Sequence, residues 1–155
     1  MSQADDFAQK LEAVNDALVA AVESCDDAAW QATSADEGWS AAALAHHIAE
    51  DHVLISGVVT GIGAGGFGMP LTPDALDAMN ATHAQEFAAV RKSEVIDLAK
   101  ANCAIAVSAL RAMNDDQFAQ TAEFFGETMT AAQVTEAILI GHPLGHLESF
   151  KAATG

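Results

Sequence analysis

Two histidines in the last part of the chain have the spacing of metal ligands. His142 and His146 are four residues apart, and in an α-helix such residues lie one turn apart on the same side. Two imidazoles in this arrangement can reach one ion, as they do in the metal-binding helices of zinc proteases. If the two rings were only packed in the core, their polar nitrogens would still need partners there. The spacing therefore predicts part of a divalent-metal site, with core packing as the alternative.

A third ligand must come from another segment, and His47 is the strongest candidate. It lies in an apolar run that follows Ser40, a residue type that favours a helix N-cap. Steps of three and four residues place His47 on the side of this helix that carries the apolar residues Leu44, Ile48, Ile55 and Val58. The same steps place His46 and His52 elsewhere, although His46 remains an alternative ligand. A lone inward histidine is often a core residue, so the metal role of His47 depends on the pair near the end of the chain.

Three neutral histidines would leave the full +2 charge on a bound ion. Imidazole is a borderline ligand that suits zinc, nickel, copper or iron without thiolates. A coordination position left open to solvent would bind water or a substrate atom and lower its pKa, as in catalytic metal sites. We therefore expect His47, His142 and His146 to hold zinc or nickel in a site that performs chemistry.

Other side chains near these histidines have more than one interpretation. Asp51, one turn after His47, can orient an imidazole through its free nitrogen or coordinate the metal itself. Glu50 and Glu148 are alternatives for the same role. His83 shares an apolar stripe and is either a packing residue, which we favour, or a fourth ligand, a hydrogen-bond donor or a substrate contact.

Pro143 lies between the two histidines of the pair. A proline inside a helix removes one backbone hydrogen bond and clashes with the carbonyl four residues earlier. With Gly141 and Gly145 beside it, we expect the helix to bend or bulge here, an irregularity that recurs at functional sites. The alternative is a kink that is merely tolerated.

The elements that position these residues are predicted to be helices. A helix over residues 3–24 follows from apolar residues at spacings of three and four, namely Phe7, Leu11, Val14, Leu18, Val22 and Cys25. A second helix begins after Ser40. We expect it to end in a flexible glycine-rich connection, made of Gly57, Gly61, Gly63, Gly65, Gly66 and Gly68 and closed by Met69-Pro70.

A third helix is expected to begin with Pro73 after the N-cap Thr72, because the N–H that proline lacks would be unpaired at that position. Its stripe is Leu76, Met79, His83, Phe87 and Val90. Ser93 is expected to cap a continuation, with a kink or a short loop at residues 91–93. The continuation repeats the pattern through Ile96, Ala99, Cys103, Ala106, Leu110 and Met113.

Residues 114–129 are expected to form a connector that tucks Phe124 and Phe125 against the other helices, with brief strand pairing. The last helix then begins at a T-x-x-Q capping box formed by Thr130 and Gln133. Its stripe is Val134, Ile138, His142, His146 and Phe150. Four or five amphipathic helices with short polar connectors predict an all-α antiparallel bundle, and the length predicts one domain over residues 1–155.

Charge and composition limit the partners. Twenty-two acidic residues against six basic ones give a formal charge of −16, which repels phosphate backbones and anionic lipids. We therefore expect no nucleic acid and no membrane as partner, and a cytoplasmic location, because no secretion signal and no membrane-spanning run is found. Gly61, Gly63 and Gly66 match G-x-G-x-x-G but follow a helix, which argues against a nucleotide site. Cys25 and Cys103 are interpreted as packing residues.

Two short motifs are similar to those of the DinB/YfiT-like superfamily of metal-binding helical bundles. They are Gly38-Trp39-Ser40 leading to His47-Ile48-Ala49, and His142-x-x-x-His146-Leu147. The resemblance spans nearly the whole chain. It implies a four-helix bundle of up-down-down-up topology, for which the long glycine connection would supply the crossover, with the three histidines at one end of the core.

The resemblance also implies an activity. Characterised members are metal-dependent transferases or isomerases that use a low-molecular-weight thiol such as bacillithiol, mycothiol or glutathione, and a metal can bind such a thiol as thiolate at neutral pH. We thus expect a thiol-dependent enzyme acting on a small molecule, in a homodimer. Arg91, Lys92 and Arg111 are the candidate anchors for an anionic thiol. The alternatives are a non-catalytic metal- or ligand-binding domain and a metal-dependent hydrolase.

Overall fold

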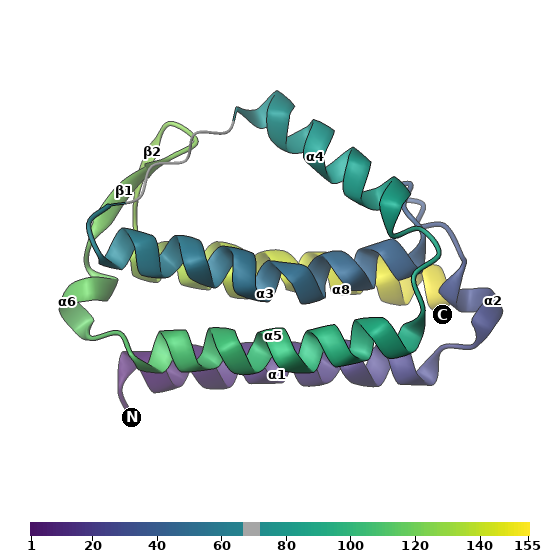
Figure 1. The fold of residues 1–155 in the computed structure, drawn as a ribbon, viewed down its shortest axis with the longest axis horizontal. Coiled ribbons are helices and arrows are strands. Elements are labelled where there is room, and N and C mark those ends of the chain that lie inside the picture. The colour runs from purple at the N-terminus through teal and green to yellow at the C-terminus, as the bar shows by residue number, and fades with distance from the viewer. Residues whose placement is uncertain (67–71) are drawn as a thin grey trace.

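Four long helical segments lie side by side in the computed structural model, which describes residues 1–66 and 72–155 (Figure 1). They are α1 (Gln3–Ser24), α3 (Ala41–Gly63), α5 (Lys92–Arg111) and a final helix. The final helix consists of α7 (Ala131–Val134), the π-helical segment η1 (Thr135–Gly141) and α8 (His142–Thr154). In Figure 1, α1 and α8 run in one direction and α3 and α5 in the other. The expected all-α class is confirmed, with α1 beginning and ending where the periodicity placed it.

The helix starts follow from their capping residues. The hydroxyl of Ser40 accepts a hydrogen bond from the amide of Ala43 at 3.1 Å, at the start of α3. Thr130 and Gln133 form the predicted capping box, in which the amide of each residue donates to the side chain of the other. Local residue chemistry therefore sets where these helices begin.

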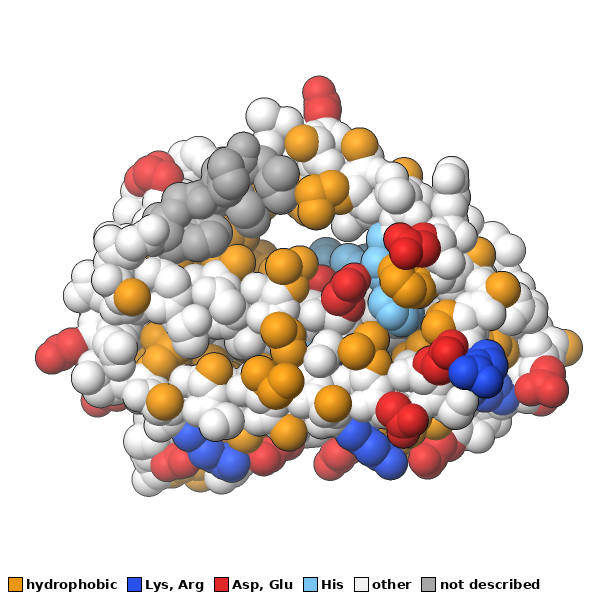
Figure 2. Space-filling view, in the orientation of Figure 1, with side chains coloured by type: hydrophobic (Ala, Val, Ile, Leu, Met, Phe, Trp, Pro, Cys, Tyr) orange, Lys and Arg blue, Asp and Glu red, His pale blue; other side chains and the backbone are white. Residues whose placement is uncertain are grey.

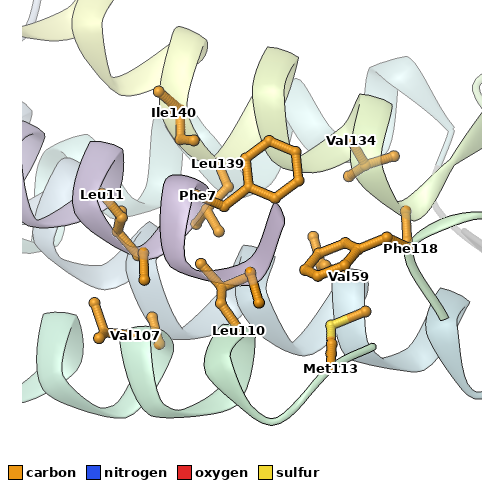
Figure 3. Packing of buried hydrophobic residues seen from close by; sticks show 14 of the residues in the cluster. Phe7, Leu11, Val59, Val107, Leu110, Met113, Phe118, Val134, Leu139 and Ile140 are labelled. Atoms are coloured by element: carbon orange, nitrogen blue, oxygen red, sulfur yellow. The ribbon is translucent and has the colours of Figure 1, made fainter. Parts of the chain in front are cut away.

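The hydrophobic core has two regions. One joins the first half of α1 to α5, α7 and η1, and Figure 3 shows its side chains interlocking around Phe7, Leu110 and Leu139. The other surrounds Phe150 and Trp30, the latter in the short helix α2 (Asp27–Trp30). Cys103 is buried and Cys25 is half-buried, and both are free thiols, which fits the packing role expected of them.

Helix α3 occupies the centre of the bundle. Every residue from Ala41 to Ala49 is buried, because this half of α3 is covered on all sides by neighbouring segments. The sequence therefore predicted only some of the buried residues of α3. Ile55 and Val58 are half-buried, whereas Val59 and Ile62 are fully buried.

The glycine-rich connection begins later than expected. Gly57 and Gly61 lie inside α3, and the helix ends at Gly63. A side chain at Gly63 would collide with the end of Met113, since an added Cβ would lie 2.7 Å from its methyl carbon. Gly65 has φ +75°, which suits glycine after a helix end. The expected residues Gly68 and Met69-Pro70 lie outside the described residues.

The predicted third helix and its continuation are two separate helices, joined by a short loop that comes a few residues earlier than expected. Helix α4 (Pro73–Glu86) starts after the expected N-cap Thr72, but it leans away from the bundle in Figure 1 and has no fully buried residue. Residues 87–91 then turn back into α5, which completes the bundle. The N-cap of α5 is Arg91 and not Ser93, because the carboxylate of Glu94 accepts hydrogen bonds from the backbone and side chain of Arg91.

The crossover between the parallel helices α3 and α5 is therefore carried by α4 and not by glycines alone. The loop after α4 is held by two hydrogen bonds from other segments. The indole N–H of Trp30 donates to the carbonyl of Val90 at 2.7 Å, and the hydroxyl of Ser40 donates to that of Ala88 at 2.8 Å. These bonds fix the end of α4 beside the start of α3.

A small hairpin connects α5 to the final helix. After α6 (Asp115–Phe118), strand β1 (Thr121–Phe124) pairs antiparallel with β2 (Glu127–Thr130). Phe125 and Gly126 both have positive φ, as in a two-residue hairpin turn. The expected strand pairing is confirmed, but only Phe124 is buried, and Phe125 is 43% exposed. Within the described residues, no helix combines the length and apolarity needed to cross a bilayer.

His52 was expected to point away from the core, yet its side chain is fully buried. Its Nε2 lies 3.2 Å from Oδ1 of Asn15 on α1, which accepts the N–H of the neutral ring. Its Nδ1 has no partner among the described residues. Burial lowers the pKa of His52 to about 4, so the folded protein keeps this ring uncharged.

The buried His52 should make the folded protein less stable in acid. Because its pKa is lowered from 6.5 to about 4, the unfolded chain binds one more proton between these values, and stability falls as the pH falls through this window. Because of this residue, the free energy of unfolding should fall by about 2 kcal/mol between pH 7 and pH 5. His52→Gln keeps a donor for Asn15 but cannot ionise, so urea unfolding should show a correspondingly flatter pH dependence. An identical pH dependence in both proteins would contradict this assignment.

Candidate metal centre

The three histidines predicted as ligands come together in space. His47 lies in the second turn of α3, and His142 and His146 lie in the first two turns of α8. One ring nitrogen from each lies within 4.8 Å of the other two. The Nε2 atoms of His142 and His146 are 2.9 Å apart, and the ring centres of His47 and His146 are 4.9 Å apart. Figure 2 shows histidine side chains gathered beside a hollow under α4.

The irregular helix expected around Pro143 is present, and it precedes the histidine pair. In η1 the backbone bonds reach back five residues, and the amide of His142 donates to the carbonyl of Ala137. Pro143 then lies in the first turn of α8, directly after the wider π-helical turn. The pair itself sits on regular α-helix, so the spacing of four residues keeps both rings on one side.

Glu37 is a functional candidate that the sequence did not indicate. Its Oε1 lies 2.6 Å from Nδ1 of His146 and accepts the N–H of that ring. This hydrogen bond leaves Nε2 of His146 unprotonated and directed at His142. Among the carboxylates considered from the sequence, Glu148 instead pairs with Lys151. The only sequence signal for Glu37 is its place next to Gly38-Trp39-Ser40.

The segment before α3 is held in one conformation by its own hydrogen bonds. The amide of Glu37 donates to the hydroxyl of Ser34, and the amide of Gly38 donates to the Ser34 carbonyl at 2.9 Å. Gly38 has φ +72°, a conformation that favours glycine. The turn directs Trp39 at the histidines, where its ring stacks on that of His146 at 6.3 Å and meets that of His47 edge-on at 5.4 Å.

Asp51 lies beside His47, as the spacing predicted. Its Oδ2 is 3.2 Å from Nε2 of His47, but the atoms are not aligned for a hydrogen bond, and this Nε2 has no partner among the described residues. Burial lowers the pKa of His47 to about 3, with a smaller contribution from the neighbouring histidines. Burial raises the pKa of Asp51 to about 7. The two groups therefore do not form an ion pair, and His47 offers a free lone pair.

A cavity of about 320 Å³ adjoins the histidine pair. Its lining consists of Glu37, Trp39, Asp77, Asn80, Ala81, His142 and His146. Helix α4 therefore supplies one wall and α8 the other. A larger groove of about 520 Å³ lies between α1 and α5, but its lining contains neither of the two groups of convergent ligand atoms found in the described residues. We place the site at the smaller cavity for that reason.

His46 and His83 contact each other beside this group, and the ring centre of His83 lies 5.4 Å from that of His47. His46 is buried, contrary to expectation, and its Nδ1 lies 2.8 Å from Nε2 of His83. The same Nε2 lies 3.1 Å from Oε2 of Glu50. Burial lowers the pKa of both rings. His83 was expected to be a packing residue, and its contacts are instead with polar groups as well as with the ring of Phe87.

The three basic residues considered as anchors for an anionic thiol lie elsewhere. Arg91 pairs with Glu94, and Arg111 pairs with acidic residues of α1. Lys92 donates a hydrogen bond to the carbonyl of Cys25. None of the three lines the cavity, so that expectation was wrong.

The fold and the site define a helical bundle in which three imidazoles from two helices converge beside a cavity. The family model described as the DinB superfamily matches residues 10–149. The chain belongs to the DinB superfamily. The identification from the two sequence motifs is confirmed.

Two solved structures resemble this fold over the whole chain. They are a mycothiol-dependent maleylpyruvate isomerase, with TM-score 0.72 and 14% identity, and its H52A mutant, with TM-score 0.71 and 13% identity. Each match covers 100% of this chain, which spans 63% of the length of the solved chains. None of the curated proteins compared with the chain matches its sequence.

Removing the carboxylate of Glu37 should change which ring nitrogen of His146 carries the proton. In the native protein the Nδ1–H tautomer of His146 should predominate, because Glu37 accepts that proton at 2.6 Å. In Glu37→Ala the Nε2–H tautomer should become substantially populated. Long-range ¹H–¹⁵N NMR of the imidazole nitrogens measures this ratio directly. Glu148→Ala, a change on α8 that leaves this bond intact, serves as the control, and equal tautomer ratios in both variants would contradict the assigned role.

Proposed function

We propose that His47, His142 and His146 hold one divalent metal ion, zinc or nickel, and that the protein is a metal-dependent enzyme that uses a low-molecular-weight thiol. The observation that carries the proposal is the convergence of three imidazole nitrogens within 4.8 Å. Glu37 would orient one of these rings, as carboxylates commonly do for histidine ligands.

The donor atoms fit a divalent cation. His47 is a free base whose Nε2 lacks a partner among the described residues. His146 has its Nδ1 proton engaged by Glu37, which leaves Nε2 available. A bound ion would also replace the close contact between two ring nitrogens of His142 and His146. Three neutral imidazoles are a ligand set that zinc and nickel accept.

A divalent ion in this position would keep a thiol deprotonated at neutral pH. The residues of the chain would then position the reactants. Trp39 offers an aromatic wall, and Asp77 and Asn80 on α4 offer polar groups to a small-molecule substrate. In a transfer, a sulfur lone pair forms a bond to an electrophilic carbon while the leaving group departs with its bonding electrons. In an isomerisation, the thiol adds, and it departs again unchanged.

The lining of the cavity favours a thiol without carboxylates. Glu37 and Asp77 are acidic, and no lysine or arginine is among the lining residues. A glutathione or bacillithiol molecule would bring its own carboxylates close to these groups, at an electrostatic cost. Mycothiol carries none. The similarity in fold to a mycothiol-dependent isomerase supports the same choice.

Truncating one ligand should release the metal from this site. We expect His142→Ala to weaken zinc binding here by more than about 100-fold and Glu37→Gln by about 10- to 100-fold, since the first change removes a donor atom and the second only its orienting bond. Competition with a chromogenic chelator measures both affinities. Leu144→Ala alters an exposed residue between the two histidines and should leave the zinc affinity unchanged. Wild-type affinity in His142→Ala would exclude this site.

Thiol dependence can be tested with the metal-loaded protein, a panel of electrophiles and the three thiols. We expect the protein to consume an electrophile only when a thiol is present, and to lose this activity in His142→Ala. Because of the acidic lining, the rate should be at least about tenfold higher with mycothiol than with glutathione. Product analysis by mass spectrometry identifies the new carbon–sulfur bond or the isomer. Turnover without any thiol would indicate a hydrolase instead. Metal binding without turnover across the panel would indicate a non-catalytic domain.

A further inference from the structure

A second group of ligand atoms lies next to the first, since the ring centres of His83 and His47 are 5.4 Å apart. We infer that His46, Glu50 and His83 form a second divalent-cation site. One ligand atom from each residue lies within 4.8 Å of the other two. His46 and Glu50 are one helical turn apart on α3, and His83 reaches them from the last turn of α4. This site shares no ligand with the three-histidine site and goes beyond the function proposed above.

The protons available in this group cannot satisfy its contacts. Nε2 of His83 lies 2.8 Å from Nδ1 of His46 and 3.1 Å from Oε2 of Glu50. If Nε2 carries a proton, it can be aligned with only one of these acceptors. If Nε2 is unprotonated, it can accept from His46 but then faces the carboxylate of Glu50 with its lone pair. A divalent cation would instead attract all three lone pairs at once.

The surroundings of the group suit a bound ion. The ring of His46 is stacked on that of Phe87, with centres 3.6 Å apart, and the side chain of His83 is only 11% exposed. The side chain of Glu50 is 48% exposed and so leaves an approach from solvent. Two neutral imidazoles and one carboxylate are a known ligand set for zinc. The carboxylate also neutralises part of the charge of the cation.

A cation here would join α4 to the bundle. Helix α4 has no fully buried residue, so few apolar contacts hold its middle in place. His83 is one of its more buried side chains, and Asp77 and Asn80, one to two turns earlier, line the cavity of the first site. An ion bound by His46, Glu50 and His83 would therefore fix the position of the wall that faces a substrate.

Zinc titration separates the two sites. The full-length protein, freed of metal by dialysis against chelator, should bind two equivalents of Zn²⁺ in isothermal titration calorimetry. His83→Ala and Glu50→Gln should each bind one, His142→Ala should bind one, and the double variant His83→Ala/His142→Ala should bind none. Met79→Ala, an exposed change on the same helix, should still bind two. Circular dichroism checks that every variant is folded.

Hydrogen exchange supplies an independent measurement. Added Zn²⁺ should slow amide exchange of residues 73–86 in His142→Ala, where only the second site remains, and should have no such effect in His83→Ala. The inference is overturned if Glu50→Gln and His83→Ala bind as much zinc as the wild type, or if exchange in α4 does not respond to zinc. Loss of the first site alone would leave the His83-dependent equivalent in place, so failure of one site is distinguishable from failure of the other.

Discussion

The burial of polar rings by α3 is the constraint on which the rest of the structure depends. This helix is enclosed over its first nine residues, and its first half carries His46, His47 and, slightly later, His52 into the interior. Each of these buried rings contacts a different segment. His52 meets Asn15 on α1, His46 meets α4, and His47 meets the rings of α8. The relative positions of these segments are thereby tied to one helix.

The final helix accommodates Pro143 without changing the spacing of His142 and His146. Pro143 would interrupt a regular helix that ran through the histidine pair. The π-helical segment η1 absorbs the interruption before the pair begins, and its close backbone packing leaves little room for a side chain at Gly141. His142 and His146 consequently keep their regular spacing. The same turn places them opposite His47 and within reach of Glu37.

Much of the fold and of the candidate site could be predicted from the sequence, and the features that the sequence did not reveal have physical causes. Periodicity and capping residues located α1 and the starts of α3, α4 and the final helix, because these depend on local interactions. Periodicity failed for His46 and His52 because neighbouring segments cover α3 on more than one side, so a single apolar stripe does not mark all of its buried residues. Periodicity placed the break between α4 and α5 at residues 91–93, a few residues late, because apolar residues recur at helical spacing up to Val90. Glu37 was missed because its contact with His146 spans 109 residues and depends on a turn.

Helix α4 contributes to the cavity while contributing little to the core. Asp77 and Asn80 face the cavity, whereas the residues that stabilise the bundle belong to the other helices. Changes along α4 should therefore be tolerated by the fold more readily than changes in α3. The architecture separates the part that holds the histidines from the part that supplies Asp77 and Asn80 to the cavity. The shape and charge of the cavity can consequently be altered through α4 in a variant library without rebuilding the scaffold.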